Sequence, residues 1–375
     1  MDSRVVVCLD KFRGSLRADE ACAALAQGIR AAAPAHDVRE VPVADGGEGT
    51  IDALVRAGYE RRAAAAHDPA GRPVQVDFAV RDGRAVVELA QASGLHHVAG
   101  QQIPLTASTF GTGEVIRAAL GEGCSTIVLA VGGSATTDGG AGMLQALGAR
   151  LLTADGSPAG PGGAGLLGLA RVDLAGLDPR LARTEVILAS DVSNPLLGPE
   201  GAAAVYGPQK GASPRDILVL EEGLERLATA MARETGADRA GDPGAGAAGG
   251  TGFAALAVLG ARRRPGIEFM LEELHVAKLL DGACLAVTGE GRLDSQSLQG
   301  KAPAGVAALA ASLGVPLVLV AGQLDLTAAQ QRDLGAAGAY SLTAAAGSVG
   351  EAIRQAAPLL TGIGRQLAVA HLNPR

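Results

Sequence analysis

Seven glycine-rich segments hold most of the side chains that could bind phosphate, a metal ion or a substrate hydroxyl group. Glycine lets backbone N–H groups approach a phosphate closely, and Asp, Asn, Ser and Thr side chains can hold Mg²⁺ or a hydroxyl group. Any one of these segments could instead be an ordinary turn. Together they favour a site for phosphate, Mg²⁺ and a polyol. The segments are 9–16 (LDKFRGSL), 44–50 (ADGGEGT), 131–142 (VGGSATTDGGAG), 190–198 (SDVSNPLLG), 207–212 (GPQKGA), 243–250 (PGAGAAGG) and 288–301 (TGEGRLDSQSLQGK).

Lysine is rare in this chain, since only four of the 32 basic residues are lysines. Lys11, Lys210 and Lys301 stand in glycine-bearing segments, whereas Lys278 does not. The lysine ammonium group is a compact point charge that suits phosphate. This placement therefore favours phosphate contacts, and chance placement is the alternative.

Asp191 is the most suggestive carboxylate, because it follows the apolar run EVILAS and opens the segment DVSNP. A carboxylate in that position could accept a proton from a substrate hydroxyl group. The same segment contains Asn194, one of two asparagines in the chain, which could hold a metal ion or a hydroxyl group. The alternative is an Asx-turn at the end of a strand.

Two nucleotide-binding motifs are matched only in part. Gly244, Gly246 and Gly249 satisfy the GxGxxG spacing, but they follow a polar stretch rather than a strand, so a dinucleotide site is not expected there. Lys301 follows a glycine as in a P-loop, but Ser295 occupies the position of the required upstream glycine. The segment is therefore not a P-loop.

Histidine and cysteine do not form a metal-binding pattern in this sequence. His96 and His97 are the only adjacent pair of histidines, and their polar surroundings predict a solvated loop. The cysteines are isolated from one another and are expected to be small buried hydrophobic residues. They are Cys8, Cys22, Cys124 and Cys284.

The elements that would position these residues alternate between strands and helices at both ends of the chain. Apolar runs at 5–9 and 38–43 predict strands, and the segments that follow them contain Asp10 and Asp45. Such alternation predicts a parallel sheet, whose ligands bind at the carboxyl ends of the strands. Further strands, each followed by a helical pattern, are predicted near 284–288, 317–320 and 339–342.

The middle of the chain begins with a different pattern. The runs 74–80 and 85–89 flank Asp82-Gly83 and predict a hairpin, and strands are predicted near 126–131 and 185–189. Ser213 followed by proline predicts a helix start.

We therefore predict an α/β protein with two α/β domains. The first is a doubly wound, Rossmann-like domain with a parallel sheet, formed by residues 1–66 and 282–375. The second is an inserted α/β domain at residues 67–281.

Composition excludes several classes of partner. The net charge is −7 and the longest basic run is three arginines, so neither nucleic acid nor an anionic membrane surface is expected to bind. The apolar runs are too short to cross a bilayer, and the N-terminus lacks the apolar region of a signal peptide. A cytoplasmic protein is expected.

In these segments the sequence resembles the glycerate kinase family of the bacterial glycerate 2-kinase type. The resemblance extends in the same order over nearly the whole chain. It is carried by LDKFRGSL, VPVADGGEGT, ELAQASGL, GTGEVI, GGSATTDGGAGM, LGARLL, DVSNPLLGPEGAAAVYGPQKGA, PGAGAAGGTG, PGIE and TGEGRLDSQSLQGKAPAGVA.

The resemblance implies transfer of the ATP γ-phosphoryl group to the 2-hydroxyl group of D-glycerate, with Mg²⁺, in the cleft of a two-domain α/β fold. Two departures are visible: Arg13 stands where the family commonly has lysine, and Thr137 stands where asparagine is more usual. The first leaves open whether Lys11 or Arg13 meets the phosphate, because an arginine keeps the charge but changes the geometry.

The roles expected on this basis follow from phosphoryl transfer, in which the protein mainly positions groups and neutralises charge. Asp191 is the candidate base, and Asp191 and Asp294 are the tentative Mg²⁺ ligands. Candidate cationic contacts are Lys11, Arg13, Lys210 and Lys301, with Arg292 in reserve. The remaining candidates for substrate, nucleotide or metal contacts are Asp45, Gly46, Gly47, Glu48, Gly49, Ser134, Asp138, Asn194, Gly289 and Glu290.

Three alternative functions remain open at the level of sequence. They are glycerate phosphorylation at the 3-hydroxyl group, a nicotinamide-dependent hydroxy-acid dehydrogenase and a non-enzymatic sensor of hydroxy acids. The dehydrogenase would need a GxGxxG motif after a strand, and the sensor a partner-binding segment; neither pattern is visible. Either a monomer or a homodimer fits the sequence.

Overall fold

The computed structural model describes residues 3–298 and 300–372, which form two compact α/β units. The first unit contains residues 1–45, 52–57 and 265–375, and the second contains residues 46–51 and 58–264. The prediction of an α/β fold with two such domains is confirmed. None of the helices in the described parts of the chain has the length and apolar character that a membrane span requires.

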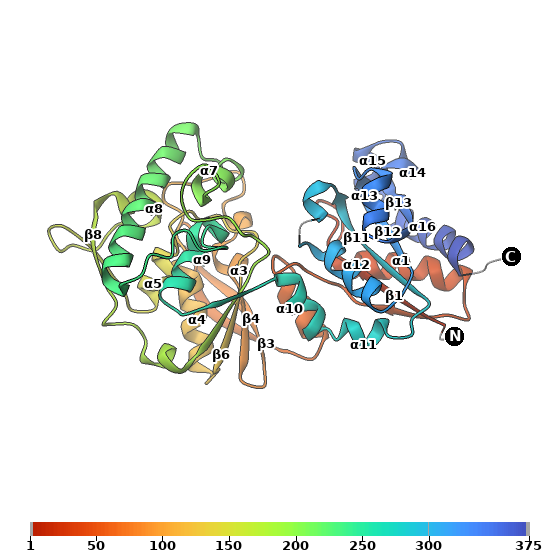
Figure 1. Cartoon of the computed structure of the whole chain (residues 1–375), viewed down its shortest axis with the longest axis horizontal. Coiled ribbons are helices and arrows are strands. Elements are labelled where there is room, and N and C mark those ends of the chain that lie inside the picture. The colour runs from red at the N-terminus through yellow and green to blue at the C-terminus, as the bar shows by residue number, and fades with distance from the viewer. Residues whose placement is uncertain (1–2, 299, 373–375) are drawn as a thin grey trace. The chain divides into compact units, whose positions relative to one another are not determined.

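The first unit is a doubly wound domain with a five-stranded parallel sheet (Figure 1), in the order β13-β12-β11-β1-β2. Its central strands come from both ends of the chain, as the sequence predicts. The strands are β1 (Arg4–Leu9), β2 (Asp37–Glu40), β11 (Leu285–Leu293), β12 (Leu317–Leu324) and β13 (Ala336–Ser341). The helices are α1 (Ala18–Ala32), α10 (Gly266–Glu273), α11 (Val276–Leu280), α12 (Ala302–Ser312), α13 (Ala328–Asp333), α14 (Leu342–Ala346), α15 (Val349–Arg354) and α16 (Ala356–His371), with the short 3₁₀ helix η5 (Ser295–Leu298).

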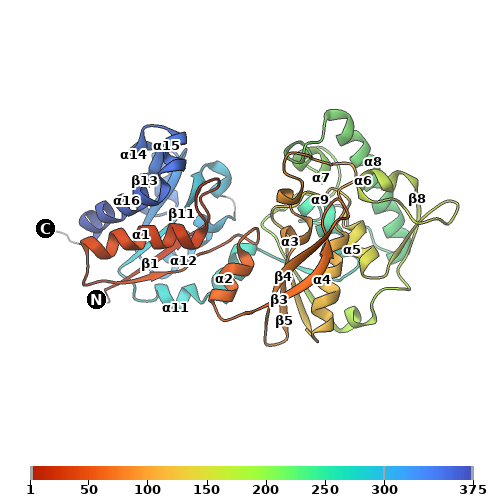
Figure 2. The same cartoon turned by 180° about the vertical axis from the view of Figure 1, so that it is seen from behind.

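Apolar residues of β1 point alternately to the two faces of this sheet, because strand side chains alternate. Val5 and Val7 pack against α1 and α16 on one face, whereas Val6 packs toward α10, α11 and α12 on the other. Figure 2 shows α1 beside α16 on this unit. The two helices approach closely at Gly28, where a Cβ atom would lie 2.0 Å from the carbonyl oxygen of Thr361.

The second unit is built on a six-stranded mixed sheet in the order β10-β9-β6-β5-β4-β3. Strands β5, β6, β9 and β10 are parallel, and β3, β4 and β5 pair antiparallel. The strands are β3 (Glu60–His67), β4 (Pro73–Arg81), β5 (Arg84–Glu88), β6 (Thr126–Ala130), β9 (Glu185–Ala189) and β10 (Arg262–Arg264); β7 (Arg150–Thr153) and β8 (Leu169–Asp173) form a separate ribbon.

The helices of the second unit include α8, which begins at Pro214 with Ser213 as its N-cap, as predicted. They are α3 (Leu89–Ser93), α4 (Phe110–Gly121), α5 (Ala141–Ala146), α6 (Gly162–Gly165), α7 (Ala202–Tyr206), α8 (Pro214–Thr235) and α9 (Ala247–Ala257). Short 3₁₀ helices are η1 (Leu95–Val98), η2 (Leu166–Gly168), η3 (Pro179–Arg183) and η4 (Pro208–Lys210). Helix α2 (Thr50–Arg56) crosses the division between the units.

The boundaries between the two units differ from the predicted boundaries at 66/67 and 281/282. Strand β3 pairs with β4 and so belongs to the second unit. Residues 265–281 belong to the first unit, because Ile267 and Leu280 are part of the core beneath α12. The predicted hairpin is confirmed, and both Asp82 and Gly83 have the positive φ that a tight hairpin turn requires.

Candidate functional site

In the first unit, a buried ion pair lies at the carboxyl end of the parallel strand β1. Asp10 follows this strand directly, is 4% exposed and donates its backbone N–H to the Gly289 carbonyl oxygen at 2.9 Å. Its Oδ1 accepts a hydrogen bond from the Lys11 backbone N–H at 2.6 Å and lies 3.6 Å from Lys11 Nζ. The Lys11 side chain is largely buried as well. A lysine predicted from its glycine-bearing segment is thus paired with an aspartate that was not predicted as a site residue.

Burial raises the pKa of Asp10 to about 7. The neighbouring Lys11 ammonium opposes that shift, while the carboxylates of Asp45 and Glu290 add to it. Asp45 and Glu290 therefore lie within electrostatic reach of Asp10. The first unit thus places two further carboxylates within electrostatic reach of the Asp10–Lys11 pair.

Glu290 connects this group to the segment that precedes α12. Burial raises the pKa of Glu290; the Ser297 hydroxyl and Lys301 oppose the shift, and the charges of Asp45 and Asp294 add to it. Within the described residues, Glu290 Oε1 is buried without a hydrogen-bond partner. A buried carboxylate oxygen of this kind can accept a hydrogen bond or a cation.

Gly289 and Lys301 owe their positions to the local backbone. At Gly289 a Cβ atom would lie 1.6 Å from the Val320 carbonyl oxygen, so a side chain is excluded there. Lys301 is the N-cap residue of α12, whose first turn contains Pro303. Its half-buried side chain therefore starts at a helix N-terminus, where an anion is favoured.

The two arginine candidates of the first unit are more exposed. Arg292 has 61% of its side chain exposed and donates from Nε to Asp325 Oδ2 at 2.8 Å. Arg13 is exposed, and its backbone nitrogen passes so close to Gly291 that a Cβ atom there would lie 2.8 Å away. Of the two cationic side chains in the segment 9–16, Lys11 is therefore the one that pairs with a buried carboxylate, that of Asp10.

In the second unit, the segment 46–49 packs against the loop that follows β6. Gly132 donates its backbone N–H to the Gly46 carbonyl oxygen at 3.1 Å, and a Cβ atom on Gly132 would lie 2.5 Å from the Gly47 Cα. This contact needs glycine at position 132. Glu48 is exposed beside it, and Gly49 has a φ of 97°.

Asp138 is fully buried in the same loop, and both of its carboxylate oxygens accept hydrogen bonds from other residues of the protein. Its Oδ2 accepts from the backbone N–H and the hydroxyl group of Thr109, both at 2.8 Å, and from the Gly142 N–H at 3.2 Å. Its Oδ1 accepts from the Gly140 N–H at 3.1 Å. Burial raises the Asp138 pKa, and these hydrogen bonds oppose the shift. The carboxylate therefore fixes the loop, a role that the sequence prediction of metal or hydroxyl contacts did not include.

Lys210 lies beneath that loop and is 3% exposed. Its Nζ donates to the Thr136 carbonyl oxygen at 2.5 Å and lies 3.4 Å from the Ser134 hydroxyl oxygen. The predicted neighbours Ser134 and Lys210 are thus brought together. The Lys210 amine donates to this loop, and the phosphate contact predicted for it remains a prediction.

Asp191 and Asn194 follow β9, which is the neighbour of β6 in the sheet. Asp191 is half-buried. Asn194 donates from Nδ2 to the Glu200 carbonyl oxygen at 2.8 Å and accepts at Oδ1 from the Tyr206 hydroxyl group at 2.7 Å. The Asn194 amide therefore holds its own loop in place beside the candidate base.

The metal prediction has limited support in the geometry. Within residues 3–298 and 300–372, no three His, Cys, Asp or Glu side chains are arranged to hold a metal ion. Mg²⁺ is commonly held by one or two carboxylates together with substrate phosphates. The acidic side chains around Glu290 in the first unit fit that use. Asp191 and Asp294, the tentative ligands, belong to different units.

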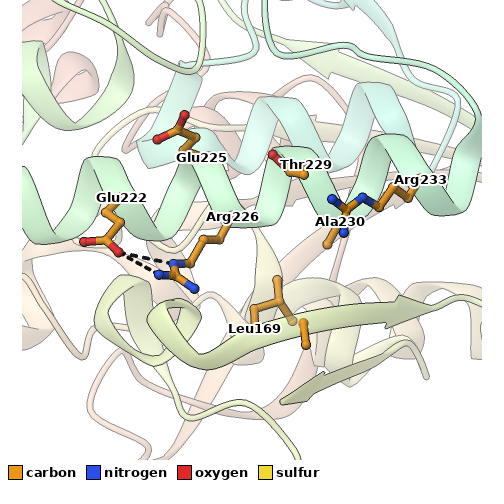
Figure 3. A pocket seen from close by; sticks show the side chains of 8 residues that line it. Leu169, Glu222, Glu225, Arg226, Thr229, Ala230 and Arg233 are labelled. Atoms are coloured by element: carbon orange, nitrogen blue, oxygen red, sulfur yellow. Dashed lines mark hydrogen bonds and ion pairs between the residues drawn. The ribbon is translucent and has the colours of Figure 1, made fainter. Parts of the chain in front are cut away.

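A surface groove of about 470 Å³ lies elsewhere in the second unit, along α8 beside β8 (Figure 3). On its α8 side Arg226 donates to Glu222 at 2.8 Å, and Glu225 and Arg233 come from the same helix. None of the residues lining it is a predicted site residue.

The model of the glycerate kinase family matches residues 5–372. A glycerate kinase of Halalkalibacterium halodurans is 43% identical over 369 residues, which is 97% of each chain. A glycerate 2-kinase of Escherichia coli strain K12 is 41% identical over 372 residues, again 97% of each chain.

A solved structure agrees with these sequence relatives. It is the crystal structure of a protein provisionally named glycerate kinase 2 from Salmonella typhimurium LT2. Its TM-score is 0.83 at 40% sequence identity, and the match covers 99% of this chain and 98% of that one. Because family model, relatives and solved structure agree over nearly the full length, the chain belongs to the glycerate kinase family.

Proposed function

We propose that this chain is a glycerate kinase that transfers the γ-phosphoryl group of ATP to the 2-hydroxyl group of D-glycerate, giving 2-phospho-D-glycerate and ADP. The observation that carries the proposal is the 41–43% identity to glycerate kinases over 97% of the chain. The choice of the 2-hydroxyl group rests on the name of the Escherichia coli relative and on the segments that resemble the glycerate 2-kinase type.

Cationic side chains in the first unit would neutralise the charge of phosphoryl transfer. Lys11 and Lys301 are the main candidates, because both carry an ammonium group near buried carboxylates at the carboxyl edge of a parallel sheet. The transition state of this reaction is loose, so positioning and charge neutralisation are the main contributions that a protein can make. Arg13 and Arg292 are exposed and would assist from the periphery.

Asp191 is the candidate that accepts the proton of the attacking hydroxyl group. The hydroxyl oxygen forms a bond to the γ-phosphorus, the bond from that phosphorus to the β–γ bridging oxygen breaks, and ADP leaves with that electron pair. The hydroxyl proton passes to the Asp191 carboxylate and from there to solvent. Its placement two residues after β9 supports this role, because ligands bind at the carboxyl ends of the strands in parallel sheets.

Mg²⁺ would supply neutralisation of the phosphate oxygens when bound. Asp45, Glu290 and Asp294 are the residues of the first unit that would hold it together with the phosphates of ATP. Asp10 would stay with Lys11, because its Oδ1 already accepts the Lys11 backbone N–H.

The dehydrogenase alternative finds no support in the structure of the glycine-rich segment 243–250. Gly244 and Gly246 lie in turns ahead of α9 rather than at the end of a strand. A strand before the motif is what a dinucleotide fingerprint requires.

The proposal is tested by measuring ADP release with three acceptors under the same conditions. D-glycerate should support turnover. Lactate, which retains the carboxylate and the 2-hydroxyl group, should support slow turnover, and 3-hydroxypropionate, which lacks the 2-hydroxyl group, should support none. Turnover with 3-hydroxypropionate but not with lactate would favour the 3-hydroxyl group, and ATP turnover that is indifferent to all three would contradict the proposal.

A further inference from the structure

Lys210 carries a buried amine, and its hydrogen-bond partners among the described residues are both neutral. Its Nζ lies 2.5 Å from the Thr136 carbonyl oxygen and 3.4 Å from the Ser134 hydroxyl oxygen. The residue ends η4, and the following Gly211 has a φ of 87°, which turns the chain away. The amine therefore reaches the loop 131–142 from beneath.

Ser134 is the centre of a small polar network in that loop. Its hydroxyl oxygen accepts from the Thr136 backbone N–H at 3.1 Å and lies 3.0 Å from the Thr136 hydroxyl oxygen. The Lys210 amine contacts both ends of this network, at Ser134 and at the Thr136 carbonyl. Moving the amine would release the turn at 134–136.

The loop held in this way is the one that contacts the segment 46–49. Gly132 is hydrogen-bonded to Gly46, and Gly139 donates its N–H to the Gly249 carbonyl oxygen at 2.9 Å. The backbone is packed too tightly for side chains, since a Cβ atom on Gly249 would lie 1.9 Å from the Thr136 carbonyl oxygen. Lys210 thus adds a side-chain contact from outside the loop to these close backbone contacts.

An ammonium group is costly at such a position. Burial lowers the pKa of Lys210 to about 7, and the charge of Asp138 opposes the shift. Among the described titratable groups, Asp138 is the one whose charge acts on Lys210. An apolar side chain of similar size would avoid this cost, but it could not donate a hydrogen bond to the Thr136 carbonyl oxygen.

We propose that Lys210 is a positioning residue for phosphoryl transfer: its buried amine holds the turn at 134–136 in the form that receives the anionic substrate, and the neutral fraction of that amine takes up a proton when the substrate binds. This inference rests on the proposed function, which supplies the anionic substrates glycerate and ATP. An anion near the loop favours the charged amine, so binding and proton uptake must promote each other. Lys210 acts through the loop and is not assigned a contact with substrate.

Lysine NMR tests the titration without any reference to activity. The chain has four lysines, so labelling with ¹³Cε-lysine gives four resonances, and the Lys210→Met and Lys278→Met variants assign two of them. In the free protein the Lys210 resonance should titrate near pH 7. With D-glycerate and a non-hydrolysable ATP analogue it should titrate at least one pH unit higher, a tenfold increase in proton affinity.

Kinetics then tests the positioning role. Wild-type kcat/KM should fall as the pH rises through about 7, whereas the corresponding limb of kcat should lie at higher pH, because kcat reports the complex with substrate. Lys210→Met should lower kcat/KM on the order of 10- to 100-fold and abolish the limb. Exposed Lys278 provides the matched control, and Lys278→Met should leave both profiles unchanged.

The outcomes separate the two proposals. If wild type releases no ADP with glycerate, the proposed function fails, and so does the assignment of Lys210 to that reaction, even if the NMR titration is as expected. If wild type is active but the Lys210 resonance titrates near its ordinary value, or does not move when substrates bind, the inference alone is overturned. The same holds if Lys210→Met loses thermal stability but keeps the wild-type KM values and pH profile. Should Lys210→Met fail to fold, the wild-type titration with and without substrates still decides.

Discussion

Oδ1 of Asp10 lies 3.6 Å from Lys11 Nζ while it accepts the Lys11 backbone N–H at 2.6 Å. The carboxylate thus binds both ends of the residue that follows it, and it does so at the end of a buried strand. The lysine is kept at the carboxyl edge of the sheet even without substrate. Because Asp45 and Glu290 raise the Asp10 pKa further, the arrangement is sensitive to pH.

Asp10→Asn should change how stability depends on pH. The folded pKa of Asp10, about 7, lies above the value of about 3.8 for the unfolded chain, so the folded state binds the proton more tightly. The resulting stabilisation is fully present below about pH 3.8 and is lost as the pH rises through about 7. Between pH 5 and pH 8, the free energy of unfolding measured by urea titration should therefore decrease more for wild type than for Asp10→Asn. Equal pH slopes for the two proteins would mean that Asp10 does not titrate in this range.

Asp138→Asn should destabilise the second unit. Four donors from Thr109, Gly140 and Gly142 now point at the Asp138 carboxylate. In the variant, the NH₂ group of the asparagine amide would face some of these donors and leave them without an acceptor. The expected loss is about 2 to 4 kcal/mol of unfolding free energy. Glu48→Gln, on an exposed carboxylate of the same unit, should change stability by less than about 0.5 kcal/mol. A stable Asp138→Asn protein with a raised Mg²⁺ requirement would instead restore the predicted metal contact.

Gly249→Ala should be far more destabilising than Gly236→Ala. Both glycines have positive φ values, of 66° and 77°, so both alanine variants bear similar backbone strain. At Gly249 the new Cβ would also lie 1.9 Å from the Thr136 carbonyl oxygen, whereas at Gly236 no atom lies within 4 Å. We expect a loss of about 1 kcal/mol at Gly236 and about 3 kcal/mol or more at Gly249. Thermal melting of both variants measures the difference, and equal losses would show that the loop can give way.

Asp191→Asn should lower kcat while leaving the fold and both KM values nearly unchanged. A positioned general base contributes about 10²- to 10⁴-fold, and the lower end is expected because the hydroxyl group keeps its proton until late in a loose transition state. Turnover should be measured across a Mg²⁺ titration, with melting temperature alongside and with exposed Asp155→Asn as the control. Recovery of the rate in excess Mg²⁺ would make Asp191 a metal ligand. A rate within threefold of wild type, with a lower melting temperature, would reduce it to a turn residue.

Much of the fold could be predicted because local patterns agree with it. The serine, proline and apolar spacing at the start of α8, and Asp82-Gly83 in the hairpin, are local signals that packing did not override. Strand β3 was missed because its sequence ERRAAAAH contains no β-branched or aromatic residue. Its pairing with β4 is a tertiary effect that composition does not reveal.

The candidate site could be predicted in residue type but not in depth. The glycine-rich segments do bring Ser134 beside Lys210, and they bring Asp10, the partner of Lys11, within electrostatic reach of Asp45 and Glu290. Burial depends on contacts distant in sequence, so local patterns could not predict that Lys210 lies beneath its loop or that Asp138 accepts hydrogen bonds from Thr109, Gly140 and Gly142. Asp10 had the visible signal of a strand end beside a rare lysine, and only its burial distinguishes it from an ordinary turn residue.

The position of the phosphate on the product tests the central claim most directly. Purified protein is incubated with ATP, Mg²⁺ and D-glycerate and coupled to enolase and pyruvate kinase, without phosphoglycerate mutase. Because enolase accepts the 2-phosphate, a signal that is immediate and unchanged when the mutase is added is the predicted result. A signal that appears only after the mutase is added would identify the 3-phosphate and contradict the account.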